Sequence, residues 1–218
     1  MALAIFDLDN TLIAGDSDHL WGEFLVAHGI VDDGDFKRTN DQFYHDYVQG
    51  RLDIYAYQRF VLKVLADHPV EQLAVWRHQF MQESIAPIML TKAKALLTEH
   101  RSRGDFLLII TATNDFVTSP IAEQLGVDHL IATTAEIKHG RYTGDVSGTP
   151  CYREGKVLRL HEWLKESGHS LQGSAFYSDS HNDIPLLEVV THATAVDPDP
   201  VLEREALERG WPILSLRG

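Results

Sequence analysis

The sequence predicts an α/β protein in which helices cover both faces of a parallel sheet and a helical bundle is inserted after the first strand. From residue 88 onward, short apolar runs alternate with helical patterns, as in proteins whose parallel strands are joined by helices. Between residues 16 and 86, by contrast, apolar residues recur at helical spacing. The 218 residues, 44% hydrophobic and 23% charged, suffice for one such core with a smaller appendage.

The first strand is expected at Leu3-Ala4-Ile5-Phe6, an apolar run that stops at Asp7. Such a run is typical of a strand buried on both faces, and open α/β sheets carry their active sites at the carboxyl ends of strands. Because side chains alternate along an extended chain, Asp7 and Asp9 should point to the same side. Two neighbouring carboxylates repel each other, so we expect a metal ion, a lysine or both beside them. Taken alone, this short pattern also fits a polar turn.

Four helices are expected in the insert, separated by Gly29, Gly34, Gly50 and the pair His68-Pro69. Most of their aromatic residues should serve packing, and a substrate-facing role for one or two is the alternative. The four apolar stripes are Leu20, Trp21, Phe24 and Leu25; Phe36, Phe43, Tyr44 and Tyr47; Phe60, Val61, Val64 and Leu65; and Leu73, Trp76, Phe80 and Met81.

The core is expected to resume after Pro87 with a helix from Lys92 to His100 and a strand from Phe106 to Ile110. Ser119 and Pro120 fit the N-cap and first residue of the next helix. The remaining expected elements are a strand at His129–Ala132, a hairpin-like excursion at Glu136–Val146, a helix at Glu154–Ser167, a strand at Ser174–Tyr177, a short helix at Ile184–Val190, and strands at Ala193–Val196 and Ile213–Leu214.

Charge and composition narrow the classes of partner. The formal net charge of -13 disfavours nucleic acid and anionic membrane surfaces, because both reward clustered Lys and Arg. No apolar run approaches the roughly 20 residues that cross a bilayer, and the amino terminus shows no secretory leader. The single Cys151 cannot form an intramolecular disulfide. These features predict a cytoplasmic protein in a reducing environment.

Four polar groups follow strand ends or begin helices of the predicted sheet, in an order that fits one site. They are Asp7 with Asp9, Thr111, Lys156, and Asp179 with Asn182 and Asp183. This set resembles the haloacid dehalogenase-like hydrolase superfamily, and within it most resembles the phosphoserine phosphatase-like family, subfamily IB. The segments that carry the closer resemblance are Ile109-Ile110-Thr111, Gly140-Arg141-Tyr142-Thr143-Gly144-Asp145-Val146 and Ser178-Asp179-Ser180-His181-Asn182-Asp183.

The resemblance implies a Rossmann-like α/β core made of residues 1–15 and 87–218. Residues 16–86 would then form a helical-bundle cap, because the insert follows the first motif directly, as the cap does in that family. We expect this cap to pack separately and to move over the ligand. Its closure would exclude bulk water and bring Asp16 near the leaving group.

The resemblance also assigns roles to the acidic residues. Asp7 would attack phosphorus and form an aspartyl phosphate, which divides one difficult hydrolysis into two displacements. Asp9 would act as general acid and then general base, and its backbone carbonyl would bind the metal. Asp179 would complete an all-oxygen Mg²⁺ site with Asp7, and Asn182 and Asp183 would hold ligands or metal-bound waters.

The phosphoryl group would be held by hydroxyl and amide donors. Thr111 would donate its hydroxyl to a phosphoryl oxygen, and the backbone amides of Leu8, Ala112 and Thr113 would help to fill the cradle. Lys156 would supply positive charge. Phosphoryl transfer depends mainly on positioning and charge neutralisation, so an ion, a lysine and a ring of donors suffice.

The expected function is Mg²⁺-dependent hydrolysis of a small phosphorylated metabolite, as in phosphoserine phosphatases. Histidinol-phosphate phosphatase activity with the same chemistry is one alternative, and a non-catalytic module that binds a phosphorylated ligand is another. The sequence does not choose between Mg²⁺ and Mn²⁺ or give an oligomeric state.

The chain departs from the phosphoserine phosphatase pattern at several positions. Ser178 and Ser180 replace the glycines that usually flank Asp179 in the last motif. Asp16 stands where that family has a substrate-contacting glutamate, and a carboxylate there suits an amine-bearing substrate. Arg51 and Arg59 are candidates for binding a substrate carboxylate. The identity of the metabolite therefore stays open between phosphoserine and histidinol phosphate.

Overall fold

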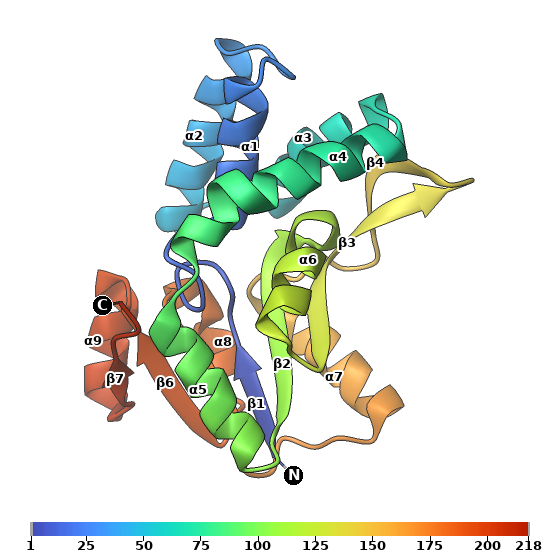
Figure 1. Cartoon of the computed structure of the whole chain (residues 1–218). Coiled ribbons are helices and arrows are strands. Elements are labelled where there is room, and N and C mark those ends of the chain that lie inside the picture. The colour runs from blue at the N-terminus through green and yellow to red at the C-terminus, as the bar shows by residue number, and fades with distance from the viewer. Residues whose placement is uncertain (1, 218) are drawn as a thin grey trace.

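The computed structural model describes residues 2–217 and contains a seven-stranded sheet (Figure 1). Its order is β4-β3-β2-β1-β5-β6-β7, and every neighbouring pair is parallel except the antiparallel hairpin of β3 and β4. The bounds are β1 Leu3–Phe6, β2 Phe106–Asn114, β3 His129–Lys138, β4 Arg141–Ser147, β5 Ala175–Ser178, β6 His192–Val196 and β7 Ile213–Leu214. The predicted α/β class is confirmed, and β1 lies between the strands that carry the later motifs.

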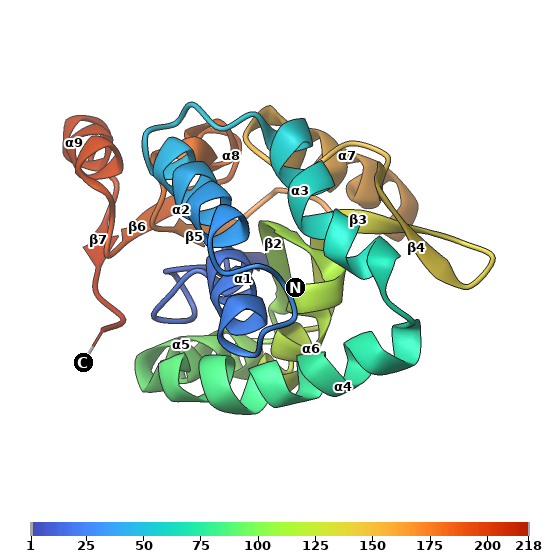
Figure 2. The ribbon, with the colours of Figure 1, turned by 90° about the horizontal axis from the view of Figure 1, so that it is seen from above.

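Helices cover both faces of the sheet. The core helices are α5 Thr91–Ser102, α6 Asp115–Leu125, α7 Glu154–Ser167, α8 Ile184–Leu187 and α9 Pro200–Arg209. Leu97 of α5 and Ile121 of α6 pack with Phe6 on one face, whereas Leu160 of α7 packs with Ile5 and other residues on the opposite face. The alternation of Ile5 and Phe6 between the two clusters is that of a fully buried strand. Figure 2 shows α5 and α6 on one side of the sheet and α7, α8 and α9 on the other.

The insert is helical, as the apolar spacing predicts. It contains α1 Ser17–Ala27, α2 Asp35–Val48, α3 Ile54–Asp67 and α4 Val70–Phe80, followed by a π turn at Met81–Ile85 and a 3-10 turn at Ala86–Ile88. In residues 2–217 no strand lies between Phe6 and Phe106, although Ile13 and Met89 form an isolated bridge where the chain leaves and re-enters the core. The four helices lie over the carboxyl ends of the strands (Figure 1).

The hydrophobic core of the insert continues into the α/β core. Trp21 packs against Phe80 within the insert and against Phe116 of α6, with ring centroids 5.2 and 5.5 Å apart. These residues belong to one buried cluster, so on this side the insert is not packed separately. The boundaries at residues 16 and 86, and the motion of the cap, stay predictions.

Helix α6 begins earlier than the sequence suggests, so the expected start at Ser119 and Pro120 is wrong. Asn114 is the N-cap, and its Oδ1 accepts the Val117 amide at 3.3 Å. Pro120 lies inside the helix, where its missing N–H leaves the Phe116 carbonyl without its usual helical donor. Arg77 of the insert donates to that carbonyl at 3.0 Å. A tertiary contact thus satisfies the group that proline frees.

Other elements differ in extent. β3 runs on to Lys138 because β4 pairs with it, and α8 ends at Leu187 instead of Val190. Helix α9 was not expected, although Asp199 caps it and Gly210 ends it. None of the helices in residues 2–217 has the length and apolar character needed to cross a membrane.

Candidate active site

The loop after β1 brings Asp7 next to Asp179, which follows β5. β1 pairs with β5, and the Asp7 amide continues the ladder by donating to the Tyr177 carbonyl at 2.9 Å. The Thr11 hydroxyl lies 3.4 Å from Asp7 Oδ2 and 3.1 Å from Asp179 Oδ1, and it also accepts the Asp179 amide at 3.1 Å. The two strand ends are therefore tied together by one threonine, which the sequence analysis did not single out.

Lys156 from the first turn of α7 lies between two carboxylates. Its Nζ donates to Asp7 Oδ1 at 2.7 Å and to Asp183 Oδ2 at 2.8 Å, and its side chain is only 3% exposed. Burial alone would lower the pKa of this ammonium, but Asp183 and Asp7 raise it well above its usual value. Lys156 is therefore a permanent positive charge against the Asp7 carboxylate.

Asp9 is held by three donors from two elements, α1 and β2. Its Oδ1 accepts the Ser17 amide at 2.7 Å, at the start of α1, and its Oδ2 accepts the Thr113 hydroxyl at 2.8 Å and the Thr111 hydroxyl at 3.4 Å. Burial and the charge of Asp16 raise the pKa of Asp9 to about 6, against the hydrogen bonds that lower it. This carboxyl group can exchange a proton near neutral pH while its orientation stays fixed.

The negative charge around Asp7 exceeds what Lys156 neutralises. Burial raises the pKa of Asp7 to about 7, with Asp183 and Asp9 adding to the effect. Burial, Asp7 and Asp183 also raise the pKa of Asp179 well above its usual value. Buried oxygen ligands with unbalanced negative charge are what a hard divalent cation requires, so these residues fit Mg²⁺. Within residues 2–217, no three acidic, His or Cys side chains already converge as a metal cluster, so waters or backbone oxygens would complete the set.

Asn182 and Asp183 bond to protein groups. Asp183 Oδ2 accepts Lys156 and also the Ser178 hydroxyl at 2.7 Å. Asn182 Oδ1 accepts the Tyr152 hydroxyl at 3.1 Å and Arg153 Nε at 3.0 Å. These contacts orient the last motif around Lys156. A role for either residue in holding metal-bound water stays a prediction.

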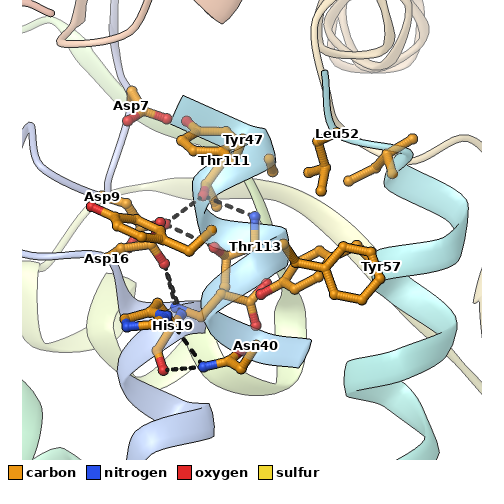
Figure 3. Close-up of a pocket in the computed structure, with 15 residues that line it drawn as sticks. Asp7, Asp9, Asp16, His19, Asn40, Tyr47, Leu52, Tyr57, Thr111 and Thr113 are labelled. Atoms are coloured by element: carbon orange, nitrogen blue, oxygen red, sulfur yellow. Dashed lines mark hydrogen bonds between the residues drawn. The ribbon is translucent and has the colours of Figure 1, made fainter. Parts of the chain in front are cut away.

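A cavity of about 40 Å³ lies between these carboxylates and the cap helices (Figure 3). Its volume is enough for a few water molecules. Its wall combines carboxylates with aromatic rings and contains no Lys or Arg among the described residues. The lining residues are Asp7, Asp9, Asp16, Asp18, His19, Asn40, Phe43, Tyr44, Tyr47, Leu52, Ile54, Tyr57, Thr111, Ala112 and Thr113.

The aromatic stripe of α2 lines this cavity. Phe43, Tyr44 and Tyr47 all belong to the wall, whereas Phe36 stacks on Phe60 with ring centroids 4.5 Å apart. The sequence predicts that most aromatic residues of the insert serve packing, with a substrate-facing role for one or two as the alternative. Three residues of this stripe line the cavity, and their contact with a substrate stays a prediction. Helical spacing alone does not separate the two uses, because a cavity wall and a core both need one apolar face.

Asp16 reaches the cavity from the N-cap of α1. Its Oδ1 accepts the amides of Asp18 and His19 at 3.0 and 2.8 Å, and burial raises its pKa despite these bonds. Arg51 and Arg59, the expected carboxylate binders, are both exposed and absent from the wall. Arg51 instead lies 3.4 Å from Asp46.

A family model described as haloacid dehalogenase-like hydrolase matches residues 4–188. The chain belongs to this family. It is 45% identical over 219 residues to a protein from Neisseria meningitidis named histidinol-phosphatase, covering 99% of each chain. It is 31% identical over 219 residues to a phosphoserine phosphatase from Mycobacterium tuberculosis, covering 99% of this chain and 71% of the relative. A crystal structure of a protein of unknown function from Bordetella pertussis matches with a TM-score of 0.94, 44% identity and 99% coverage of both chains.

The chain is thus a haloacid dehalogenase-like phosphatase of the phosphoserine phosphatase-like type. The structure brings Asp7, Lys156 and Asp179 together and places Thr111 beside Asp9. It also adds cavity residues that sequence reasoning missed. These are Asp18, His19, Asn40, Leu52, Ile54 and Tyr57. His19 lies on α1 and Tyr57 on α3, two helices that the sequence predicts. No motif marks the side of each helix that faces the cavity.

Proposed function

We propose that this phosphatase is a Mg²⁺-dependent phosphomonoester hydrolase whose substrate carries an amine or imidazole, with histidinol phosphate as the first candidate. The observation that carries the proposal is the cavity wall, in which four aspartates meet aromatic rings and no Lys or Arg is present among the described residues. Such a wall suits a cationic leaving group that lacks a carboxylate.

The geometry supports attack by Asp7. Lys156 binds Oδ1 at 2.7 Å, whereas Oδ2 has only the longer contact with Thr11 at 3.4 Å. In the first step Oδ2 forms a bond to phosphorus while the bond from phosphorus to the ester oxygen breaks. Asp9, with a pKa of about 6, gives its proton to the departing oxygen. In the second step Asp9 takes a proton from water, which attacks phosphorus and releases Asp7 and inorganic phosphate.

Charge neutralisation comes from two sources in this proposal. Lys156 offsets the charge of Asp7 and Asp183. Mg²⁺, bound by Asp7, Asp179 and the Asp9 carbonyl, would supply further positive charge to the phosphoryl oxygens. The Thr111 hydroxyl and the amides of residues 8, 112 and 113 would bind the phosphoryl oxygens. A cytoplasmic location also belongs to the proposal, supported by the lone, buried Cys151.

Histidinol phosphate fits the wall better than phosphoserine does. Phosphoserine brings a carboxylate, which would face Asp16 and Asp18 with no Lys or Arg from the described cavity wall to offset it. Histidinol phosphate has an imidazolylmethyl group in place of that carboxylate, and Tyr44 and Tyr47 can stack on its ring. The name of the Neisseria relative supports the same choice. Phosphoserine stays the second candidate because of the mycobacterial relative's name.

A phosphate-release screen tests the proposal. Wild type would be compared on histidinol phosphate, phosphoserine, a neutral sugar phosphate and p-nitrophenyl phosphate, with Mg²⁺, Mn²⁺ or EDTA. We expect the highest kcat/KM on histidinol phosphate and loss of turnover in EDTA. A higher kcat/KM on phosphoserine or the sugar phosphate would refute the substrate assignment. Stabilisation by phosphate esters without any release of phosphate would favour the non-catalytic alternative.

Asp16→Asn provides the matching variant. Asn is as good an N-cap as Asp, so α1 should keep its cap while the cavity loses one negative charge. We expect kcat/KM on histidinol phosphate to fall at least tenfold further than on p-nitrophenyl phosphate. Asp53→Asn is the control, because Asp53 caps α3 through the Ala56 amide at 3.0 Å but is exposed and outside the cavity. An unchanged preference in Asp16→Asn would remove amine recognition from Asp16.

A further inference from the structure

Three buried side-chain atoms in residues 2–217 have no hydrogen-bond partner, and one of them belongs to a residue that lines the cavity. They are Ser17 Oγ, Asn40 Oδ1 and Gln58 Oε1. Ser17 follows Asp16 and donates its amide to Asp9, whereas Gln58 donates to the carbonyl of Ala112 in the cavity wall at 3.4 Å. Folded proteins pair nearly all buried polar atoms, so an unpaired one beside a cavity indicates a missing partner.

Asn40 is the member of this group that itself lines the cavity. It lies on α2, is 2% exposed, and donates through Nδ2 to the His19 carbonyl at 3.1 Å and to His19 Nδ1 at 3.2 Å. Figure 3 shows both bonds. A carbonyl oxygen can only accept, so the nitrogen of Asn40 must face His19 and the oxygen is fixed as the unpaired atom.

The tight packing of α2 on α1 prevents Asn40 from turning away. A Cβ on Gly22 of α1 would collide with the Asn40 amide and lie 2.8 Å from its Oδ1. Glycine at this position is therefore what allows the amide to lie flat against α1. The ring of His19 is stacked on Tyr44, with centroids 4.6 Å apart, which holds the acceptor for Asn40 Nδ2 in place.

We propose that Asn40 is a specificity-determining residue whose Oδ1 accepts a hydrogen bond from an N–H group of the substrate's leaving group. The inference rests on the proposed function, since it takes the leaving group to be nitrogenous. The cavity wall also contains four aspartates, whose carboxylates accept from N–H donors and repel a competing anion. A leaving group with an ammonium or an imidazole N–H supplies the donor that the protein lacks, and a leaving group without one leaves a buried acceptor unpaired.

The experiment uses four phosphate esters that divide the donors between them. Histidinol phosphate has both ammonium and imidazole, 3-(imidazol-4-yl)propyl phosphate has only the ring, 2-aminoethyl phosphate has only the ammonium, and p-nitrophenyl phosphate has neither. In Asn40→Leu, which removes both polar atoms at similar size, we expect kcat/KM on histidinol phosphate to fall at least tenfold further than on p-nitrophenyl phosphate. The single-donor ester that falls with it identifies the N–H group.

Asn40→Asp separates two roles of Asn40: accepting a hydrogen bond from the substrate and donating one to His19. It keeps an oxygen at the Oδ1 position but loses the donor to His19, so we expect the preference for nitrogenous esters to persist. If Asn40→Asp loses the preference as Asn40→Leu does, Asn40 only positions His19 and the proposal fails. An equal loss on all four esters also refutes it. Should Asn40→Leu not fold, Asn40→Ser, with an oxygen too short to reach, replaces it.

The comparison of esters gives one result if the role of Asn40 is wrong and a different result if the proposed function is wrong. If wild type hydrolyses the nitrogenous esters with preference but the preference survives Asn40→Leu and Asn40→Ser, only the role of Asn40 is wrong. If wild type prefers p-nitrophenyl phosphate or the neutral sugar phosphate over every nitrogenous ester, the proposed function is wrong and the inference falls with it. Thermal unfolding of each variant checks that the cap remains folded.

Discussion

Replacing Asp7, the proposed nucleophile, should stabilise the metal-free protein. Burial, Asp183 and Asp9 raise the pKa of Asp7 to about 7, even though Lys156 acts in the opposite direction. In the unfolded chain an aspartate titrates near its usual value of about 3.9. The folded state therefore binds the proton of Asp7 more tightly, and the ionised carboxylate destabilises folding fully above pH 7. Asp7→Asn removes that cost.

The magnitude follows from the difference in pKa. A difference of about 3 units corresponds to roughly 4 kcal/mol as an upper limit, at about 1.4 kcal/mol per unit. Part of this is lost because Lys156 gives up one of its two carboxylate partners in the variant. We expect a net gain of about 1–3 kcal/mol at pH 8, which raises Tm by roughly 3–9 °C for a chain of this size.

The assay is thermal unfolding in EDTA between pH 5 and pH 8. The advantage of Asp7→Asn should be largest at pH 8 and shrink as the pH falls through 7 toward 4, where wild type protonates Asp7. Asp105→Asn is the control, because the pKa of Asp105 is shifted in the opposite direction. Burial raises this pKa, but the hydrogen bond from His100 and other contacts lower it overall. That variant should lose stability at pH 8. An Asp7→Asn protein less stable than wild type at pH 8 without metal would refute the reasoning.

Three further predictions concern the cap and the core. Arg153→Ala removes a donor to the Gly50 carbonyl at 2.6 Å and a donor to Asn182. Limited proteolysis between α2 and α3 should therefore be faster and KM should rise. An unchanged rate of cleavage would contradict this. Burial raises the pKa of Cys151 to about 12, so a thiol reagent should label it only in denaturant, and rapid native labelling would exclude that burial. Gly22→Ala should lower stability by about 1–3 kcal/mol in urea unfolding, and an unshifted midpoint would contradict the close packing against Asn40.

Much of the fold follows from local patterns in the sequence. The apolar run Leu3–Phe6 forms the central strand, and α7 occupies Glu154–Ser167 as its apolar spacing and Gly168 predict. These signals are short-range, because a buried strand and a capped helix depend mainly on their own residues. The start of α6 was misplaced because Pro120 normally favours a first turn, and only the distant Arg77 makes it acceptable inside the helix.

The site also has one part that the sequence predicts and one part that it does not. Asp7, Lys156 and Asp179 meet because strand ends and helix starts of a parallel sheet converge at one edge, which the order of elements already implies. The cavity wall depends instead on how the cap helices cross. Asn40 has no motif of its own, and its contact with His19 exists only because α2 approaches α1 at a glycine. Such long-range packing has no local signature in the sequence.

Trapping the covalent intermediate tests whether Asp7 is the nucleophile. Wild type turning over histidinol phosphate would be quenched in acid and reduced with borohydride, which converts a phosphorylated aspartate to homoserine with loss of phosphate. The modified position would be read by peptide mass spectrometry. We expect homoserine at position 7 in wild type, and none without substrate or in Asp7→Asn. Homoserine at another aspartate, with Asp7 unmodified, would contradict the assignment of Asp7 as the nucleophile.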